Sequence, residues 1–343
     1  MKLLKVIAAG IAASALALAG CSSGSSESQS PTSADSTAAS SETTDVKVGI
    51  VQLPIFAPVY VAEAKGYFAD EGLNVTLETF KSGSDAIPLA SSGQLDAVAA
   101  GFSAGLFSAI ESGLGVKVVG SMGVSDGSED SPTDLVVNKA LADSGEVTSP
   151  KDLAGKDVGV AGGAGGTGAY LTALALESDG ASLADVNLVN LGNPDMPAAL
   201  ANGGIDAGLI SAPFSHHSIS DGNGVSLWVP PKGVSGTGLI YGEQFLETET
   251  AQKFFNALVR ASADLQGEDR YSDENIKIIA DATDQTPEQV RAVPLYTWEP
   301  DLAPKLDQLA DMERVWMSSG AISYSTPLDS ADYVETKFAA NAG

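Results

Sequence analysis

Short apolar runs alternate with segments of helical periodicity along the first part of the chain. Residues 46–51 and 73–78 have the pattern of strands, and residues 58–67 between them carry apolar positions at helical spacing. Two more strands are predicted at residues 95–100 and 116–119, each preceded by a helix. Because strands that alternate with helices build a parallel sheet with both faces covered, this run predicts an α/β lobe.

The same alternation starts again near residue 149. Ser149 is a favourable helix N-cap and Pro150 a favourable first helical residue. The elements predicted after them are strands at 157–161, 186–191 and 205–210 and helices at 167–178 and 196–202. This second run predicts a second lobe of the same class.

The two runs share a five-residue signature. The sequences GQLDA at 93–97 and GGIDA at 203–207 both end a predicted helix with glycine and open a strand with an aliphatic–Asp–Ala step. They stand at the same point of the two runs, which favours two related lobes. The tail from residue 239 onward is predicted to be helical, and we expect it to return and pack on the first lobe. Its predicted helices are 249–266, 273–282, 287–293 and 303–318.

The amino-terminal segment is predicted to be an export signal rather than part of the fold. Lys2 and Lys5 precede an apolar stretch over residues 6–19 that is too short to span a bilayer as a mature helix. Residues 18–21, Leu-Ala-Gly-Cys, resemble the lipobox of bacterial lipoproteins. That resemblance implies removal of residues 1–20 and a lipid on Cys21, the chain's only cysteine. Residues 21–44, rich in Ser and Thr, are predicted to be a flexible tether.

The charge of the chain narrows the classes of partner. There are 18 basic and 44 acidic residues, a formal net charge of −26. This balance argues against binding to nucleic acid and against electrostatic attachment to anionic lipid. The chain has two adjacent histidines, His216 and His217, and no cysteine beyond Cys21, so no metal site is expected.

The glycine-rich stretch at residues 161–168, AGGAGGTG, lies between a predicted strand and a predicted helix. It fits the spacing G-x-G-x-x-G, but the next strand ends without the acidic residue that a dinucleotide site requires. It also lacks the lysine of a P-loop. Glycines let backbone approach a ligand, and a helix N-terminus favours an anionic or strongly polar group. Gly165, Gly166 and Thr167 are therefore candidate ligand-binding residues.

Other turns that follow predicted strands are further candidates, because ligands of open α/β sheets bind beyond the carboxyl ends of the strands. The phenylalanines among them are equally compatible with core positions. The remaining candidate ligand-binding residues are Gln52, Phe56, Ser82, Ser84, Phe102, Ser103 and Phe214.

Residues 58–75, PVYVAEAKGYFADEGLNV, resemble the opening motif of periplasmic binding proteins for nitrate, alkanesulfonates, taurine and the pyrimidine precursor of thiamine. Residues 90–97, 152–160 and 203–207 resemble later motifs of the same family and occur in the same order. The resemblance covers residues 46–214 well and the helical tail weakly.

This resemblance implies the two-lobed periplasmic-binding-protein fold of type II, an α/β fold in which each lobe is a mostly parallel sheet flanked by helices. The ligand cleft lies between the lobes. We expect residues 45–137 and 239–343 to form the first lobe and residues 138–238 the second.

The function that the resemblance implies is the extracytoplasmic solute-binding component of an ABC importer. Its partners would be a small-molecule ligand, the permease and ATPase complex, and the membrane through the lipid anchor. We expect a monomer without cofactor, metal or catalytic residues. An enzyme on the same fold and a ligand-sensing partner of a membrane receptor are the competing hypotheses.

The identity of the ligand stays open at this stage. The four arginines all lie in the tail, so an anionic ligand such as nitrate, a sulfonate or taurine would rely on backbone N–H groups, hydroxyls and helix ends. The same turns equally permit a neutral or cationic heterocycle, such as a thiamine pyrimidine precursor or a flavin. Ser211 and Ala212 stand where members of the family often have Trp-Glu, which changes the size and polarity of the cleft.

Overall fold

The computed structural model describes residues 43–342. The predicted signal, Cys21 and almost all of the predicted tether lie outside the described residues. Within the part of the chain that is described, no helix has the length and apolar character needed to cross a bilayer.

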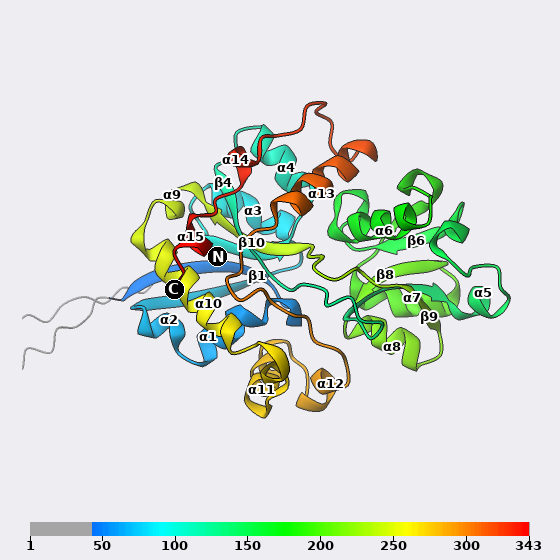
Figure 1. The fold of residues 1–343 in the computed structure, drawn as a ribbon, viewed down its shortest axis with the longest axis horizontal. Coiled ribbons are helices and arrows are strands. Elements are labelled where there is room, and N and C mark those ends of the chain that lie inside the picture. The colour runs from blue at the N-terminus through cyan, green and yellow to red at the C-terminus, as the bar shows by residue number, and fades with distance from the viewer. Residues whose placement is uncertain (1–42, 343) are drawn as a thin grey trace, which may run out of the picture. The chain divides into compact units, whose positions relative to one another are not determined.

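In residues 43–342, ten strands form two five-stranded sheets (Figure 1). The first sheet has the order β2-β1-β3-β10-β4 and the second the order β7-β6-β8-β5-β9. The strands are β1 Thr44–Val51, β2 Leu73–Phe80, β3 Ala97–Gly101, β4 Val116–Ser121, β5 Thr133–Asn138, β6 Asp157–Val160, β7 Asn187–Asn190, β8 Ala207–Ser211, β9 Gly224–Trp228 and β10 Thr237–Gly242.

Fifteen α-helices lie among and after these strands in the described residues. They are α1 Ala57–Ala64, α2 Tyr67–Asp70, α3 Gly83–Ser91, α4 Ala104–Glu111, α5 Lys139–Asp143, α6 Thr167–Ser178, α7 Met196–Asn202, α8 Phe214–Ser220, α9 Glu243–Leu246, α10 Glu249–Ala263, α11 Asp273–Ala282, α12 Pro287–Arg291, α13 Leu306–Ser318, α14 Ser330–Tyr333 and α15 Lys337–Ala340. The predicted ranges of α6, α7 and α11 agree with the structure at both ends.

Both sheets are mixed, with four strands that run in one direction and one that runs against them, as expected for mostly parallel sheets. In the first sheet β1, β2 and β3 are parallel, and β10 lies antiparallel between β3 and β4. In the second sheet β6, β7 and β8 are parallel, and β5 lies antiparallel between β8 and β9. The sequence pattern did not predict β5, β9 and β10, which join the sheets through antiparallel pairing with other strands.

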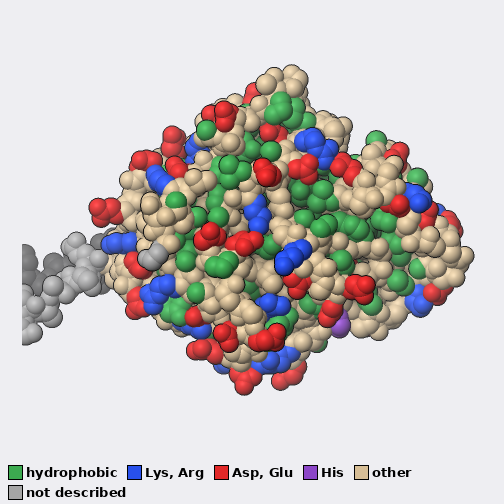
Figure 2. All heavy atoms as spheres, viewed as in Figure 1, with side chains coloured by type: hydrophobic (Ala, Val, Ile, Leu, Met, Phe, Trp, Pro, Cys, Tyr) green, Lys and Arg blue, Asp and Glu red, His purple; other side chains and the backbone are tan. Residues whose placement is uncertain are grey.

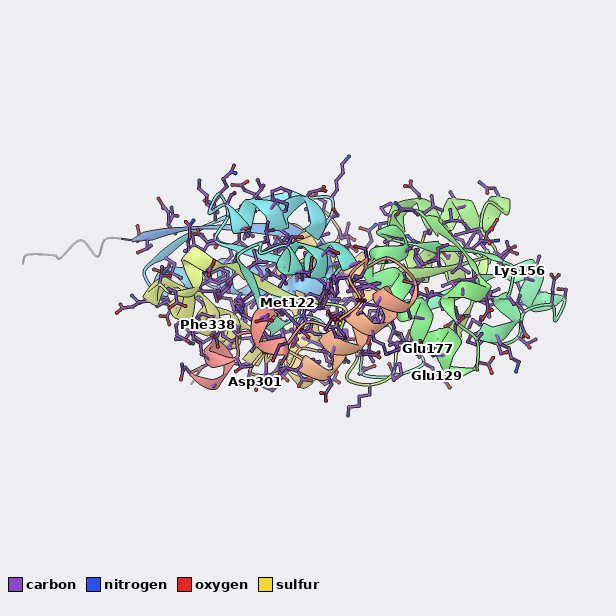
Figure 3. The ribbon with its side chains drawn as sticks, turned by 90° about the horizontal axis from the view of Figure 1, so that it is seen from above. Met122, Glu129, Lys156, Glu177, Asp301 and Phe338 are labelled. Carbon is purple, nitrogen blue, oxygen red and sulfur yellow. The ribbon has the colours of Figure 1, made fainter. Side chains whose placement is uncertain are left out.

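The predicted boundary between the lobes therefore needs correction. β5 begins at Thr133 and belongs to the second sheet, whereas the predicted first lobe extended to residue 137. β10 begins at Thr237 and belongs to the first sheet. The first lobe is accordingly residues 43–121 and 237–342, and the second lobe is residues 133–228. The chain passes between them at residues 122–132 and 229–236, the first and second crossovers; Met122 and Glu129 mark the first crossover in Figure 3.

The repeated GQLDA and GGIDA signatures have the same structural role in both lobes. The carboxylate of Asp96 accepts a hydrogen bond from the N–H of Lys47 at 2.8 Å, on β1, the second strand of the first sheet. The carboxylate of Asp206 accepts one from the N–H of Asp157 at 2.9 Å, on β6, the second strand of the second sheet. Each aspartate is also bonded through its own N–H to the carbonyl of the same strand residue, at 2.8 Å in both cases. The lobes are thus built from one repeated pattern.

The helical tail packs against both lobes. Phe254 of α10 stacks on Phe68 of the first lobe, with ring centroids 4.9 Å apart. Trp316 of α13 packs on Phe107 of α4 and also on Tyr170 of α6, which belongs to the second lobe. Figure 1 shows α13 between α4 and α6. The expectation of a tail on the first lobe alone was therefore incomplete.

Charged side chains are scattered over the face drawn in Figure 2, where acidic groups are spread widely with basic groups among them. An ion pair connects the lobes at the surface, since Arg314 of α13 reaches Glu177 of α6 at 2.9 Å. Glu177 lies on the second lobe in Figure 3. Both side chains are more than a third exposed, so this pair contributes little to stability.

Candidate functional site

A cavity of about 510 Å³ lies between the two lobes. Its walls come from the carboxyl ends of the parallel strands, from the residues that follow them, and from both crossovers. This placement is the one expected for ligands of open α/β sheets. The lining includes Ile55, Phe56, Lys81, Ser82, Phe102, Ser103, Ser125, Ser131, Pro132, Thr133, Gly165, Gly166, Thr167, Leu171, Asn193, Ser211, Gly236, Thr237 and Tyr296.

The glycine-rich turn forms the second lobe's side of the cavity. Gly162 and Gly163 have φ values of 84° and 63°, in the left-handed region that favours glycine. Gly166 has no room for a side chain, because a β-carbon there would lie 2.3 Å from the carbonyl oxygen of Ala161. These glycines allow the chain to turn tightly from β6 into α6 and bring backbone to the cavity wall.

Thr167, the first residue of α6, joins the lobes. Its hydroxyl lies 2.9 Å from the carbonyl oxygen of Phe102 and 3.0 Å from that of Gly236, and it can donate its single proton to either. Phe102 belongs to the first lobe and Gly236 to the second crossover. The Thr167 proton is therefore used in the contact between lobes rather than offered to the cavity.

Several cavity hydroxyls could not be predicted from the sequence. They come from the crossovers, from the unpredicted strands β5 and β10, and from the tail. No sequence motif distinguishes them from other Ser, Thr and Tyr residues. They belong to Ser125, Ser131, Thr133, Thr237 and Tyr296.

The family of the chain follows from its match to a family model described as NMT1/THI5 like. The match covers residues 54–268, which is more than half of the chain. The chain belongs to the NMT1/THI5-like family. The resemblance seen in the sequence motifs is thereby confirmed at the level of the family. No curated protein matches the sequence.

Solved structures share the fold of this NMT1/THI5-like chain. The alkanesulfonate-binding protein SsuA from Xanthomonas axonopodis pv. citri, bound to MOPS, is 18% identical with a TM-score of 0.62, over 82% of this chain and 96% of SsuA. The nitrate-binding protein NrtA from Synechocystis PCC 6803 is 14% identical with a TM-score of 0.67, over 83% of this chain and 84% of NrtA. At such low sequence identity, these TM-scores establish the periplasmic-binding-protein fold and nothing further.

An enzyme also shares this architecture. The desulfurization enzyme DSZB is 16% identical with a TM-score of 0.56, over 87% of this chain and 98% of DSZB. The fold alone therefore does not separate binding from catalysis, and only the residues of the site can distinguish the two.

Most of the residues predicted from the sequence line the cavity of this family member. Phe56 and Phe102 are both nearly buried and contribute to the core as well as to the wall. The Ser103 hydroxyl caps α4 by accepting a hydrogen bond from the N–H of Leu106 at 3.3 Å. The predicted residues that line the cavity are Phe56, Ser82, Phe102, Ser103, Gly165, Gly166 and Thr167.

Two of the predicted residues lie elsewhere. The amide of Gln52 donates to the carbonyl oxygen of Ala282 at 2.8 Å, so this side chain holds the end of β1 against the tail, and Gln52 is not a lining residue. Phe214 begins α8, packs against the core of the second lobe and meets the ring of His217 edge-on. The backbone of Ser84 lies in α3, and its side chain is outside what the structure describes.

The electrostatics of the cavity are simple. Lys81, in the loop between β2 and α3, is the one charged residue among the described lining residues. Asp134 lies one residue beyond the cavity wall on β5, is 4% exposed, and accepts a hydrogen bond from the Ser226 hydroxyl at 2.8 Å. Burial raises the pKa of Asp134 to about 6. A buried aspartic acid therefore supports the wall from behind.

Trp298 acts on the cavity indirectly. Its indole N–H donates to the carbonyl oxygen of Ile55 at 2.9 Å, and its ring is buried in the hydrophobic core of the first lobe. Ile55 in turn lines the cavity. The tail thus fixes a wall residue that comes from the loop after β1.

Proposed function

We propose that this protein is the solute-binding component of an ABC importer and binds a small polar or anionic organic ligand in the cavity between its lobes. The observation that carries the proposal is the cavity of about 510 Å³, with both lobes in its walls. Its size lies within the range of small-molecule sites, and its lining combines apolar side chains with a limited number of polar groups.

The charge of the lining supports a ligand with an anionic group. Lys81 supplies a positive charge, and the helices α3, α4 and α6 all begin at the cavity with their N-terminal ends. The partial positive charge of such ends favours an anion. The described lining contains no carboxylate that would oppose it.

The size of the cavity favours an organic anion over nitrate, which is far smaller than 510 Å³. SsuA is an alkanesulfonate-binding protein and NrtA a nitrate-binding protein. Of these two chemistries, a sulfonate with an organic group attached suits a wall that includes Phe56, Phe102 and Leu171. We therefore propose a sulfonate-like ligand.

We also propose an extracytoplasmic location with a lipid anchor on Cys21, a permease and ATPase complex as partner, and a monomeric binding protein without catalytic activity. The support for the anchor is the signal pattern at residues 1–21 and the Ser/Thr-rich segment after it, which would let the folded part move near the membrane. The support for binding without catalysis is a lining made of apolar side chains, hydroxyls, an amide and backbone, with Lys81 as its one charged residue among those described.

Isothermal titration calorimetry of the folded part against sulfonates, nitrate, pyrimidines and flavins tests the proposal. We expect one saturable site per chain, filled by a sulfonate and unchanged by prolonged incubation. Turnover of any bound compound, or the absence of heat and of a thermal shift with every compound in the panel, would contradict it.

A further inference from the structure

The cavity has two chemically different flanks, and sheet topology separates them. Lys81 follows β2, the edge strand of the first sheet, whereas Thr237 begins β10, three strands further along. At the usual strand spacing these positions are roughly 14 Å apart. The first crossover follows β4, next to β10. We call the side with Lys81 the lysine flank. The other side is the hinge flank, and its polar residues are Ser125, Ser131, Thr133, Asn193, Ser211, Thr237 and Tyr296.

The hydroxyl protons of the hinge flank are mostly committed. The Tyr296 hydroxyl donates to the carbonyl oxygen of Pro132 at 3.2 Å, and it lies 2.7 Å from the Thr133 hydroxyl. A carbonyl can only accept, so both bonds form together only when Thr133 donates to Tyr296. Ser125 and Ser131 likewise donate to carbonyl oxygens, at 2.6 and 2.8 Å. These hydroxyls retain lone pairs but no proton for a ligand.

The state of Tyr296 is consistent with that assignment. Burial raises the pKa of Tyr296, and hydrogen bonds from the Thr133 and Ser211 hydroxyls partly offset the effect. Because the Thr133 proton is donated to Tyr296, the Thr133 oxygen keeps only lone pairs for a further partner.

Thr237 and Asn193 are the groups of the hinge flank that can still donate a proton. Thr237 is 9% exposed, and its hydroxyl has no hydrogen-bond partner among the described residues, which is costly for a buried polar atom. The carbonyl oxygen of the Asn193 side chain accepts from the N–H of Ser211 at 2.9 Å, which leaves the Asn193 amide N–H group as a donor. The flank thus offers several acceptors together with a smaller donor capacity.

We infer that the ligand lies in one orientation, with its anionic group toward Lys81 and an uncharged hydroxyl or carboxamide toward Thr133, Thr237 and Asn193. This inference rests on the proposed sulfonate-like ligand. Such a distal group both donates and accepts, so it matches the lone pairs of Thr133 and the amide of Asn193 at once. An anionic group placed there could use the donors of Thr237 and Asn193, but it would also face the lone pairs of Thr133 and would lie far from the charge of Lys81.

A distal ammonium group fits less well than a neutral donor. It would have to lose hydration on entering the cavity, and the described lining residues provide no carboxylate to pair with it. A distal methyl group forms no hydrogen bond and leaves Thr237 unsatisfied. The ranking expected for ligands of equal length is therefore hydroxyl or carboxamide first, with methyl and ammonium weaker.

Calorimetry with a matched series of alkanesulfonates tests this ranking. Each set in the series has one chain length and contains four compounds, which end in methyl, hydroxyl, carboxamide or ammonium. Further sets repeat the four end groups at other chain lengths. We expect the hydroxyl and carboxamide compounds to bind at least about tenfold more tightly than the methyl compound, as one good hydrogen bond allows. Thr133→Val should remove that preference, and Lys81→Gln should weaken all four compounds by a similar factor.

Thr172→Val is the matched control, because Thr172 is a buried threonine of α6 whose hydroxyl donates to the carbonyl oxygen of Gly168 at 2.8 Å, and it is not a lining residue. It should leave the ranking unchanged. If no member of the series binds, the proposed ligand class is wrong. If the sulfonates bind but the methyl or ammonium compound binds as tightly as the hydroxyl compound, the class stands and the inferred hinge-flank preference is overturned. That second result needs only the unmutated protein.

Discussion

Thr167 and Gly236 fit together so closely that a β-carbon on Gly236 would lie 2.0 Å from the Thr167 methyl group. The Thr167 hydroxyl also lies 3.0 Å from the carbonyl oxygen of Gly236. Thr167 opens α6 in the second lobe, and Gly236 ends the second crossover just before β10 returns to the first. The contact therefore requires glycine at residue 236 and depends on how the lobes are closed.

Gly236→Ala should hinder closure of the lobes. The added methyl cannot share the space of the Thr167 side chain, so we expect the ligand affinity to fall by at least about tenfold while each lobe stays folded. Small-angle X-ray scattering should show a larger radius of gyration than for the unmutated protein. Gly192→Ala is the control, since its new methyl would meet nothing closer than 3.6 Å. Unchanged scattering and affinity in Gly236→Ala would exclude a role of this contact in closure.

The glycine-rich turn makes different demands at neighbouring positions. At Gly166 a β-carbon would lie 2.3 Å from a backbone oxygen, whereas at Gly165 the nearest atom is the β-carbon of Ala104 at 3.0 Å. We expect Gly166→Ala to lower the free energy of unfolding by about 1–3 kcal/mol and Gly165→Ala to lower it less. Urea denaturation measures both. Equal losses in the two variants would mean that the turn adapts to a side chain. Gly166→Asp would then test binding without disturbing the fold.

Asp134 should make stability depend on pH in an unusual direction for an aspartate. Burial raises its pKa to about 6, against 3.8 for the ordinary group, so the folded state holds a proton that the unfolded state has already lost. The free energy of unfolding is therefore unaffected by this shift below pH 4 and falls by about 3 kcal/mol as the pH rises through 6. Asp134→Asn should therefore gain stability relative to the unmutated protein between pH 4 and 7.

Chemical denaturation of both proteins across that pH range measures the difference. Other carboxylates titrate in the same window, and the comparison between the two proteins cancels their contribution. A difference that stays constant with pH would show that Asp134 is ionised in the folded protein throughout.

Cys21→Ser tests the proposed anchor. Without the thiol no lipid can be attached, so we expect the protein to move from the membrane fraction to the soluble extracytoplasmic fraction. Ligand affinity should not change, because the folded lobes begin near residue 44. Retention in the membrane fraction after washing with high salt would contradict lipid attachment through Cys21.

The sequence predicted the parallel part of each sheet well, because strand–helix alternation and the repeated glycine and Asp–Ala steps are strong local signals. The same local logic failed for β5 and β10. These strands are defined by pairing with partners far away in the sequence, β8 for β5 and β3 for β10, and their own residues have the pattern of ordinary short apolar runs. The error in the lobe boundary is a direct consequence of missing them.

For the candidate site too, local patterns identified some residues and missed those that distant segments contribute. Turns that follow parallel strands were found, as at Ser82 and Ser103, because topology places them at one edge of the sheet. Gln52 also follows a strand, but its amide is used by the tail, which no local pattern could reveal. Thr133 and Tyr296 were missed since they reach the cavity through the crossover and through a tail segment, so only the tertiary structure brings them together.

Native mass spectrometry of gently purified protein tests the central claim, that one small molecule occupies the cavity between the lobes. We expect one bound compound per chain in the unmutated protein. Ser211→Leu, which fills part of the cavity, should lose this compound, and Ser323→Leu at an exposed position outside the lining should keep it. A compound that remains bound to Ser211→Leu as strongly as to the unmutated protein would contradict the account.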